Sequence, residues 1–327
     1  MADPRQYYTL FVIVVSLVLG CEEPFTPKGE FREEPVVYVI LSNLSDTHFA
    51  RIYRTYNPPA FDPFEQKTDN PIVGALVTLS EPTTGQAVFR DTVIARADSS
   101  RYTTPIEAYV CSPLQLRRGK RYTLQVQPPG GPTLTEDALV PELGYISIYK
   151  NQPAVTGQSV IEPSIGIRVT VPTTTRGYLV RFHVTFEALQ NAVWVPHEIE
   201  IPYFVNNPGL PEERYEYYGV TRSIETEGTF GTVVTHVADF DILSYGLVIS
   251  RLYKQYGGTG SVRFKQAVFT LTQVEKQLYN YYNISRGFRD PNSIRVDEPD
   301  YTNITGGGGV FGAFSVDSIV VNLPATI

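Results

Sequence analysis

The sequence predicts a mainly β protein. An N-terminal immunoglobulin-like β-sandwich is expected at residues 35–141, followed by a second β-rich domain at 142–327 with one amphipathic helix near 272–286. The 327 residues include 25 Gly, 25 Pro and 22 Tyr, a balance that favours strands and turns over helices. Segments of strand length recur between turns, and one stretch stands out by its helical spacing. Hydrophobic residues make up 42% of the chain, which is enough for a packed core.

The first domain is predicted from segments of strand length. Residues 35–42 form a continuous apolar run, and residues 48–56 alternate, with Arg51 and Tyr53 on one face. A strand at 71–79, a Gly-containing turn and a further strand follow the rhythm of immunoglobulin-like modules.

The second domain is predicted to begin after residue 141. Residues 145–149, 164–171 and 177–187 have strand patterns, and residues 194–204 are the expected hairpin partner of the last of these.

The one predicted helix begins at Thr272, which has capping-box spacing to Glu275. Gly287 is suited to its C-terminal end. Its apolar stripe, at i, i+4, i+7 and i+8, is expected to pack on a sheet and consists of Val274, Leu278, Tyr281 and Tyr282.

The N-terminus has the parts of a lipoprotein signal peptide. Arg5 precedes an apolar run at 10–19, and Gly20 and Cys21 follow it. The run is much shorter than the roughly 20 residues of a membrane-spanning helix. We therefore expect residues 1–20 to be removed and Cys21 to carry palmitate-type acyl chains, each buried methylene contributing about 0.8 kcal/mol to membrane attachment. The alternative is an ordinary signal peptide in which Cys21 carries no lipid.

Residues 21–34 are polar and rich in Pro, as expected of a tether. Glu22 and Glu23 resemble the surface-export signal of Bacteroidetes lipoproteins, although a solvated acidic linker would have the same composition. The formal net charge of −7 argues against nucleic acid or an anionic lipid surface as a partner.

Aromatic residues in the loops of the second domain are candidates for contact with a sugar or a protein partner, with ordinary packing as the alternative. These candidate contact residues are Tyr203, Phe204, Tyr215, Tyr217 and Tyr218.

The sequence offers little that indicates catalysis. It has four His residues, none in metal-ligand spacing, and on a strand His197 and Glu198 point to opposite faces. There is no Gly-x-Ser-x-Gly motif. A non-enzyme without a cofactor is therefore predicted, and a hydrolase with a dispersed triad is the remaining catalytic alternative. Cys111 is expected to be a small buried hydrophobe.

A Ca²⁺ site near the C-terminus is one interpretation of several hard oxygen ligands that cluster there. A solvated acidic turn is the favoured interpretation of the same residues, which are Asp290, Asn292, Asp297, Glu298 and Asp300.

The C-terminal segment combines acidic-Pro and Tyr-x-Asn-Ile residues at 296–304, a Gly run at 306–309 and Phe-Gly-Ala at 311–313. In these motifs it resembles an uncharacterised Bacteroidetes outer-membrane lipoprotein family, a domain of unknown function. The resemblance extends over most of residues 35–324. The Gly run permits positive φ or close backbone approach, and a structural clasp is favoured over a ligand loop.

Members of that family are often encoded near TonB-dependent receptors. The resemblance thus implies an outer-membrane lipoprotein and assigns it no molecular role, while Glu22 and Glu23 favour display at the cell surface. Our first hypothesis is a non-catalytic binding or accessory subunit of a TonB-dependent transporter or another envelope complex. A structural or assembly component that handles no ligand is the alternative.

Overall fold

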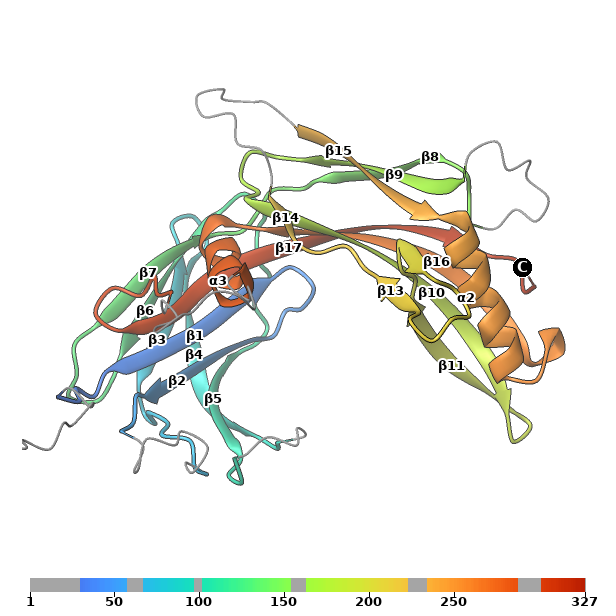
Figure 1. The fold of residues 1–327 in the computed structure, drawn as a ribbon. Coiled ribbons are helices and arrows are strands. Elements are labelled where there is room, and N and C mark those ends of the chain that lie inside the picture. Colours follow the sequence, from blue (N-terminus) through green and yellow to red (C-terminus); the bar gives the residue numbers. More distant parts are fainter. Residues whose placement is uncertain are drawn as a thin grey trace, which may run out of the picture. The chain divides into compact units, whose positions relative to one another are not determined.

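The mainly β prediction is confirmed (Figure 1). Residues 34–327 form one compact unit. The computed structural model describes residues 30–57, 67–96, 102–153, 163–222, 234–287 and 301–326.

The N-terminal part of the fold consists of short, mostly antiparallel strands. β3 pairs with β4 and β6, and β5 pairs with β2 and β4. The strands are β1 (Pro35–Ser42), β2 (His48–Arg54), β3 (Leu76–Glu81), β4 (Gly85–Ile94), β5 (Ile106–Cys111), β6 (Arg121–Gln127) and β7 (Leu134–Leu139).

The C-terminal part contains longer strands and two α-helices in the described residues. Its elements are β8 (Tyr145–Lys150), β9 (Ser164–Val171), β10 (Gly177–Gln190), β11 (Val193–Glu200), β12 (Phe204–Asn206), β13 (Arg214–Glu216), β14 (Thr221–Arg222), β15 (Val234–Asp241), α2 (Ile242–Gln255), a 3₁₀ turn (Thr259–Ser261), β16 (Val262–Val274), α3 (Lys276–Gly287) and β17 (Gly308–Asn322).

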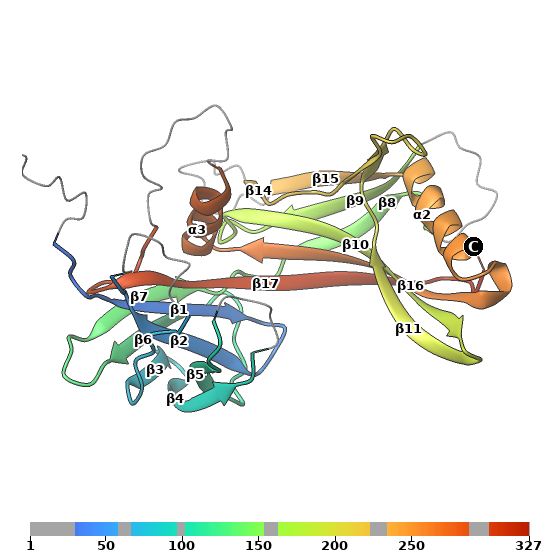
Figure 2. The same ribbon diagram turned by 60° about the horizontal axis from the view of Figure 1, so that its bottom comes forward.

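One hydrogen-bonded path of strands runs through both parts, in the order β11-β10-β16-β17-β1-β2-β5-β4-β3-β6-β7. β17 is central to it, because it pairs with β16 on one side and with β1 on the other (Figure 2). A separate sheet, β15-β9-β8, covers the second core.

Two hydrophobic cores are present. The first includes Val37, Val39 and Leu41 of β1, together with Phe311 and Ala313 of β17. In the second, aromatic rings contributed by β10, β15 and β16 pack together, and their members include Phe182, Phe240, Phe264 and Phe269. Cys111 is 7% exposed and free, as expected of a small buried hydrophobe.

The Gly run at 306–309 allows the parallel pairing of β17 with β1. Gly309 lies opposite Val37 and has φ = 105°. A Cβ on Gly309 would lie 2.0 Å from the Val37 carbonyl oxygen, and one on Gly307 would lie 2.5 Å from the Pro35 oxygen. The Gly run therefore has the structural role favoured from the sequence, that of a clasp, because it allows the backbones of β17 and β1 to approach closely.

Two Asn side chains form hydrogen bonds with the backbone of β17 beside its pairing with β1. Asn303 donates from Nδ2 to the Phe311 carbonyl (2.7 Å) and accepts from its N–H (3.0 Å). Asn43 makes the same two-way contact with the backbone of Val316 (3.2 and 2.7 Å). Each amide thus satisfies the backbone groups of β17 where a strand neighbour would otherwise be needed.

Helix α3 begins at Lys276, four residues later than the start predicted at residue 272. Thr272 belongs to β16 and pairs with Leu179 and Val316, so the predicted capping box is wrong. Strand pairing on both sides outweighed the local capping signal. Glu275 itself caps the helix, because its carboxylate accepts from the N–H groups of Gln277 and Leu278 at 2.7 Å.

A second helix, α2, was not predicted. Asp241 caps it by accepting from the Ser244 N–H at 2.7 Å. Its buried stripe faces the second core and consists of Tyr245, Val248, Ile249 and Leu252. None of the helices in the described residues has the length and apolar character that crossing a membrane requires.

A candidate ligand-binding cavity

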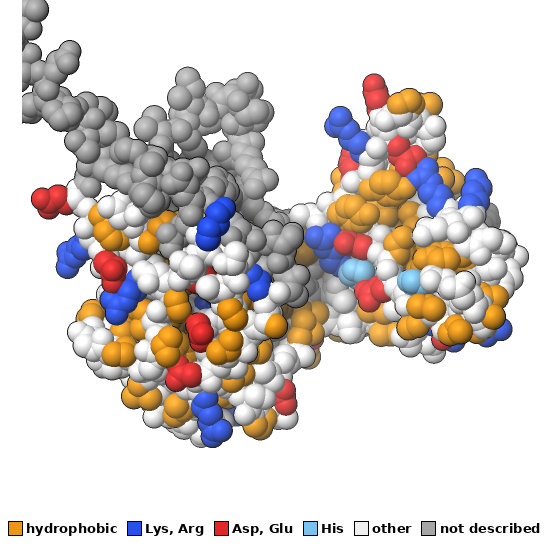
Figure 3. Space-filling model, turned by 90° about the horizontal axis from the view of Figure 1, so that it is seen from below, with side chains coloured by type: hydrophobic (Ala, Val, Ile, Leu, Met, Phe, Trp, Pro, Cys, Tyr) orange, Lys and Arg blue, Asp and Glu red, His pale blue; other side chains and the backbone are white. Residues whose placement is uncertain are grey.

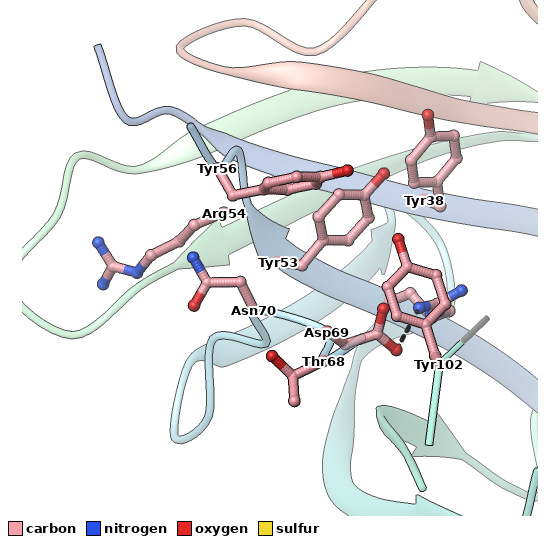
Figure 4. Close-up of a pocket in the computed structure, with 9 residues that line it drawn as sticks. Tyr38, Tyr53, Arg54, Tyr56, Thr68, Asp69, Asn70 and Tyr102 are labelled. Atoms are coloured by element: carbon pink, nitrogen blue, oxygen red, sulfur yellow. Dashed lines mark hydrogen bonds and ion pairs between the residues drawn. The ribbon is translucent and has the colours of Figure 1, made fainter. Parts of the chain in front are cut away.

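A cavity of about 390 Å³ opens on the outer face of β1 and β2 (Figure 4). Residues from four separate segments line it, and four of them are tyrosines, which are Tyr38, Tyr53, Tyr56 and Tyr102 (labelled in Figure 4). The remaining lining residues are Arg51, Arg54, Thr68, Asp69 and Asn70. Each of the nine side chains therefore carries a polar group.

Strand alternation places the first of these residues. β1 and β2 are antiparallel, with Tyr38 opposite Arg51. Val37 and Ile52 point into the first core, so their sequence neighbours point outward. Tyr38 and Tyr53 lie diagonally across the two strands, and their rings are nearly parallel, at 7° with centroids 5.7 Å apart.

The Tyr38 ring also meets the edge of Tyr281 from α3, at 6.1 Å between centroids. Burial raises the pKa of the Tyr53 phenol, and hydrogen bonding to Tyr38 raises it further. Burial likewise raises the pKa of Tyr281. These phenols are neutral at physiological pH and can each donate one hydrogen bond.

Asp69 fixes the floor of the cavity. Its Oδ2 accepts from Arg51 Nη2 at 3.2 Å and from Arg96 Nη2 at 2.6 Å. The Arg96 side chain is 10% exposed, and its Nε donates to the Thr104 carbonyl at 3.0 Å. The Arg51 side chain is 42% exposed. Arg96 is thus a positioning residue, whereas the Arg51 guanidinium can reach a ligand.

Backbone hydrogen bonds hold the lining segment against β2. The Arg54 N–H donates to the Asn70 carbonyl at 2.8 Å, and the Ile72 N–H donates to the Ile52 carbonyl at 2.9 Å. The wall formed by residues 68–70 is therefore built into the sheet and is preformed.

The cavity lies beside the point where the chain enters the fold. The Glu34 N–H donates to Thr55 Oγ1, and the Thr55 N–H donates to the Glu34 carbonyl, both at 2.9 Å. Thr55 is next to Arg54 and Tyr56 of the cavity wall. The end of the predicted tether is thus fixed to the strand that carries the cavity.

None of the candidate contact aromatics predicted from the sequence lines this cavity. Tyr203 and Tyr218 stack at 4.6 Å and pack against the second core. Phe204, Tyr215 and Tyr217 are 41%, 41% and 43% exposed. Arg251 of α2 bonds to the Tyr215 hydroxyl and to Glu213, so α2 holds the segment that includes β13.

A shallower depression of about 550 Å³ lies over β10, β11 and β16. Its charged groups pair with one another, since Lys265 Nζ lies 3.0 Å from Glu187 Oε2. Arg181 and Glu200 form a further pair on these strands. Side chains of both charges and histidines are interspersed on the face in Figure 3. This depression is therefore a weaker candidate than the tyrosine-lined cavity.

The histidines occupy structural positions. His197 and Glu198 point to opposite faces of β11, as predicted: His197 stacks on Phe186 at 5.4 Å, and Glu198 Oε1 lies 3.9 Å from His183 Nε2. His48 contacts the Leu114 carbonyl at 3.2 Å, and burial lowers its pKa. The fourth, His236, stacks on a tyrosine ring at 4.5 Å.

Several predicted sites lie outside the described residues. They are the lipidation site Cys21, the export residues Glu22 and Glu23, and the candidate Ca²⁺ ligands Asp290, Asn292, Asp297, Glu298 and Asp300. Within the described ranges, no three His, Cys, Asp or Glu residues are grouped so that they could hold a metal ion.

The sequence pattern predicted one part of the cavity, because the alternation of residues 48–56 places Arg51 and Tyr53 on one face. The same alternation places Arg54 and Tyr56 on the opposite face, although both line the cavity. Tyr38, Tyr102 and residues 68–70 were not predicted, since the fold brings them there from other segments. No spacing in the sequence connects them.

A family model described as a domain of unknown function (DUF4249) matches residues 22–319. No curated protein matches the chain.

Proposed function

The chain belongs to the DUF4249 family, and on that premise we propose that it is an outer-membrane lipoprotein anchored through acylated Cys21 and facing the cell surface. It acts there as a non-catalytic binding or accessory subunit of a TonB-dependent transporter or another envelope complex. The observation that carries the binding role is the preformed, tyrosine-lined cavity beside the end of the tether.

The anchor and the cavity support each other in this proposal. Residues 21–34, fully extended at about 3.5 Å per residue, reach roughly 50 Å. A lipid on Cys21 would therefore keep the cavity within roughly that distance of the membrane surface, where it can deliver a ligand to a membrane partner. Glu22 and Glu23 are the proposed export signal that sets the outward orientation.

Copurification tests the role. The full-length protein, tagged at its C-terminus, is extracted from membranes in mild detergent and its partners are identified by mass spectrometry. Recovery of a TonB-dependent transporter is expected. A stable envelope complex that contains no transporter and carries no ligand would favour the structural alternative.

The anchor is tested separately. The Cys21→Ser variant is expected to leave the membrane fraction and to lose the mass of the acyl chains. If this variant still fractionates with membranes at unchanged lipid mass, the lipid anchor is refuted. Protease added to intact cells is expected to cleave the wild type, and full protection would refute display at the surface while leaving the anchor intact.

A further inference from the structure

We propose that the tyrosine-lined cavity is a carbohydrate-binding site that takes a sugar ring of an oligosaccharide against its tyrosines, within reach of the exposed Arg51 guanidinium. The inference rests on the proposed function, because it names the class of ligand that the lipoprotein would hold for its membrane partner. It is carried by the composition of the wall, the hydrogen-bonding groups of its side chains and the paired strands beneath it.

The wall favours a ligand that has both polar groups and apolar faces. Its nine described residues are four Tyr, two Arg, one Asp, one Asn and one Thr, so aromatic rings and polar groups lie side by side and no aliphatic side chain is among them. A pyranose has hydroxyls around its rim and C–H groups on its faces, so it matches a wall of phenols and planar polar groups.

The polar groups of the wall supply both donors and acceptors. The Arg51 guanidinium and the Asn70 amide offer hydrogen-bond donors, and the Asp69 carboxylate next to Asn70 offers acceptors. Among the described residues, the two arginines that bind Asp69 both donate to Oδ2. Oδ1 therefore remains as an acceptor for a sugar hydroxyl.

The backbone beneath the cavity does not suit an extended peptide. Peptides commonly add to an open strand edge. β1 is paired on both sides, with β2 and β17, and β2 is bridged at Tyr53 to Pro71. The cavity thus presents side chains on the face of paired strands, where recognition depends on hydroxyl and ring chemistry.

The volume of the cavity also suits a small ligand. The volume of about 390 Å³ lies near the lower end of the range of small-molecule sites, roughly 300–1,000 Å³. This accommodates one or two sugar rings, with the rest of a chain outside. The site is thus expected to bind within an oligosaccharide or at its end.

Binding is tested on the full-length lipoprotein in detergent by isothermal titration calorimetry. The probes are maltohexaose, cellohexaose, xylohexaose, mannohexaose and trigalacturonic acid. At least one is expected to bind with a Kd of 1 mM or tighter, about −4 kcal/mol. Failure of all five to bind at that level would overturn the proposal.

Three variants locate the site. Tyr53→Ala and Arg51→Gln are each expected to weaken binding about tenfold, which corresponds to about 1.4 kcal/mol. Tyr145→Ala is the matched control, because Tyr145 is 64% exposed on β8 and lies outside the cavity wall. Equal affinities for the wild type and a folded Arg51→Gln protein would also overturn the proposal, since this exposed side chain can be changed without disturbing either core.

Failure of the ligand assignment is distinguishable from failure of the proposed function. Copurification of a transporter with no saccharide binding would refute the carbohydrate site and leave the accessory role standing. Saccharide binding that Tyr53→Ala abolishes, without any envelope partner, would support the site and refute the accessory role.

Discussion

Replacement of Gly309 by Ala is expected to be one of the most damaging small changes in this chain. The backbone at Gly309 has φ = 105°, which costs an L residue about 1–3 kcal/mol. The added Cβ would lie 2.0 Å from the Val37 carbonyl oxygen. β1 and β17 would have to separate, which weakens backbone hydrogen bonds worth about 0.5–1.5 kcal/mol each. We expect a total loss of roughly 3–5 kcal/mol, in the upper tail of single substitutions.

Gly308 provides the matched control one residue away. A Cβ there would meet only the Val36 side chain, at 3.5 Å, which is ordinary contact. Gly308→Ala is therefore expected to be neutral or slightly stabilising, because Ala loses less chain entropy than Gly on folding. Guanidinium unfolding of both full-length variants, followed by far-UV circular dichroism, measures the difference. Equal midpoints for the two variants would refute the clasp between β1 and β17.

Three further predictions concern helices and ionisable groups. Burial raises the pKa of the Glu275 carboxyl to about 6, against an unfolded value of 4.5. Its contribution to stability is therefore fully present below pH 4.5 and is lost as the pH rises through 6. Glu275→Gln is expected to remove this pH dependence of about 2 kcal/mol in the free energy of unfolding, and urea titrations that give the variant the same pH profile as the wild type would contradict the prediction. Gly312→Ala would place a Cβ 2.8 Å from Leu278 Cβ of α3 and is expected to lower the stability of the fold by about 1–3 kcal/mol. Gly246→Ala in α2 has nothing within 4 Å of its added Cβ and is expected to stabilise the fold by up to about 1 kcal/mol. Thermal melts that rank the two variants in the opposite order would contradict the close contact between Gly312 and Leu278. Hydrogen bonding to Arg251 lowers the pKa of the Glu213 carboxyl to about 2, so the stabilising contribution of this carboxylate is present above pH 4.5 and is lost as the pH falls through 2. Limited proteolysis at pH 7 is therefore expected to cut the 207–213 segment faster in Glu213→Gln than in the wild type. Identical cleavage rates would refute a stabilising role of the Glu213–Arg251 pair.

The strands were predictable because their signals are local. Alternation in residues 48–56 and 177–187, and the continuous apolar run at 35–42, correspond to β2, β10 and β1. An alternating pattern indicates a strand buried on one face, and a continuous apolar run indicates a strand buried on both faces. These strands are buried in the fold, so the local patterns predicted them.

The helices were less predictable for two different reasons. The capping signal at Thr272 was overridden because β10 and β17 both pair with that residue. α2 contains Gly246 and several β-branched residues, which have low helix propensity. It is helical because its stripe, including Tyr245 and Leu252, is buried on the second core. Tertiary packing decided both cases.

The candidate cavity could not have been assembled from the sequence. Tyr38, Tyr53 and Tyr102 are separated by long stretches of chain, and each alone has the appearance of a packing residue. They meet because β1 and β2 pair in one register and residues 68–72 are hydrogen-bonded beside β2. The cavity depends on pairings that local patterns do not encode.

The parallel pairing of β1 with β17 also has a consequence for the order of folding. Val37 and Gly309 are direct neighbours in the sheet although they lie near opposite ends of the chain. One edge of β1 therefore stays unpaired until β17 docks against it. Contacts of such long sequence separation slow folding and leave unpaired edges exposed to aggregation.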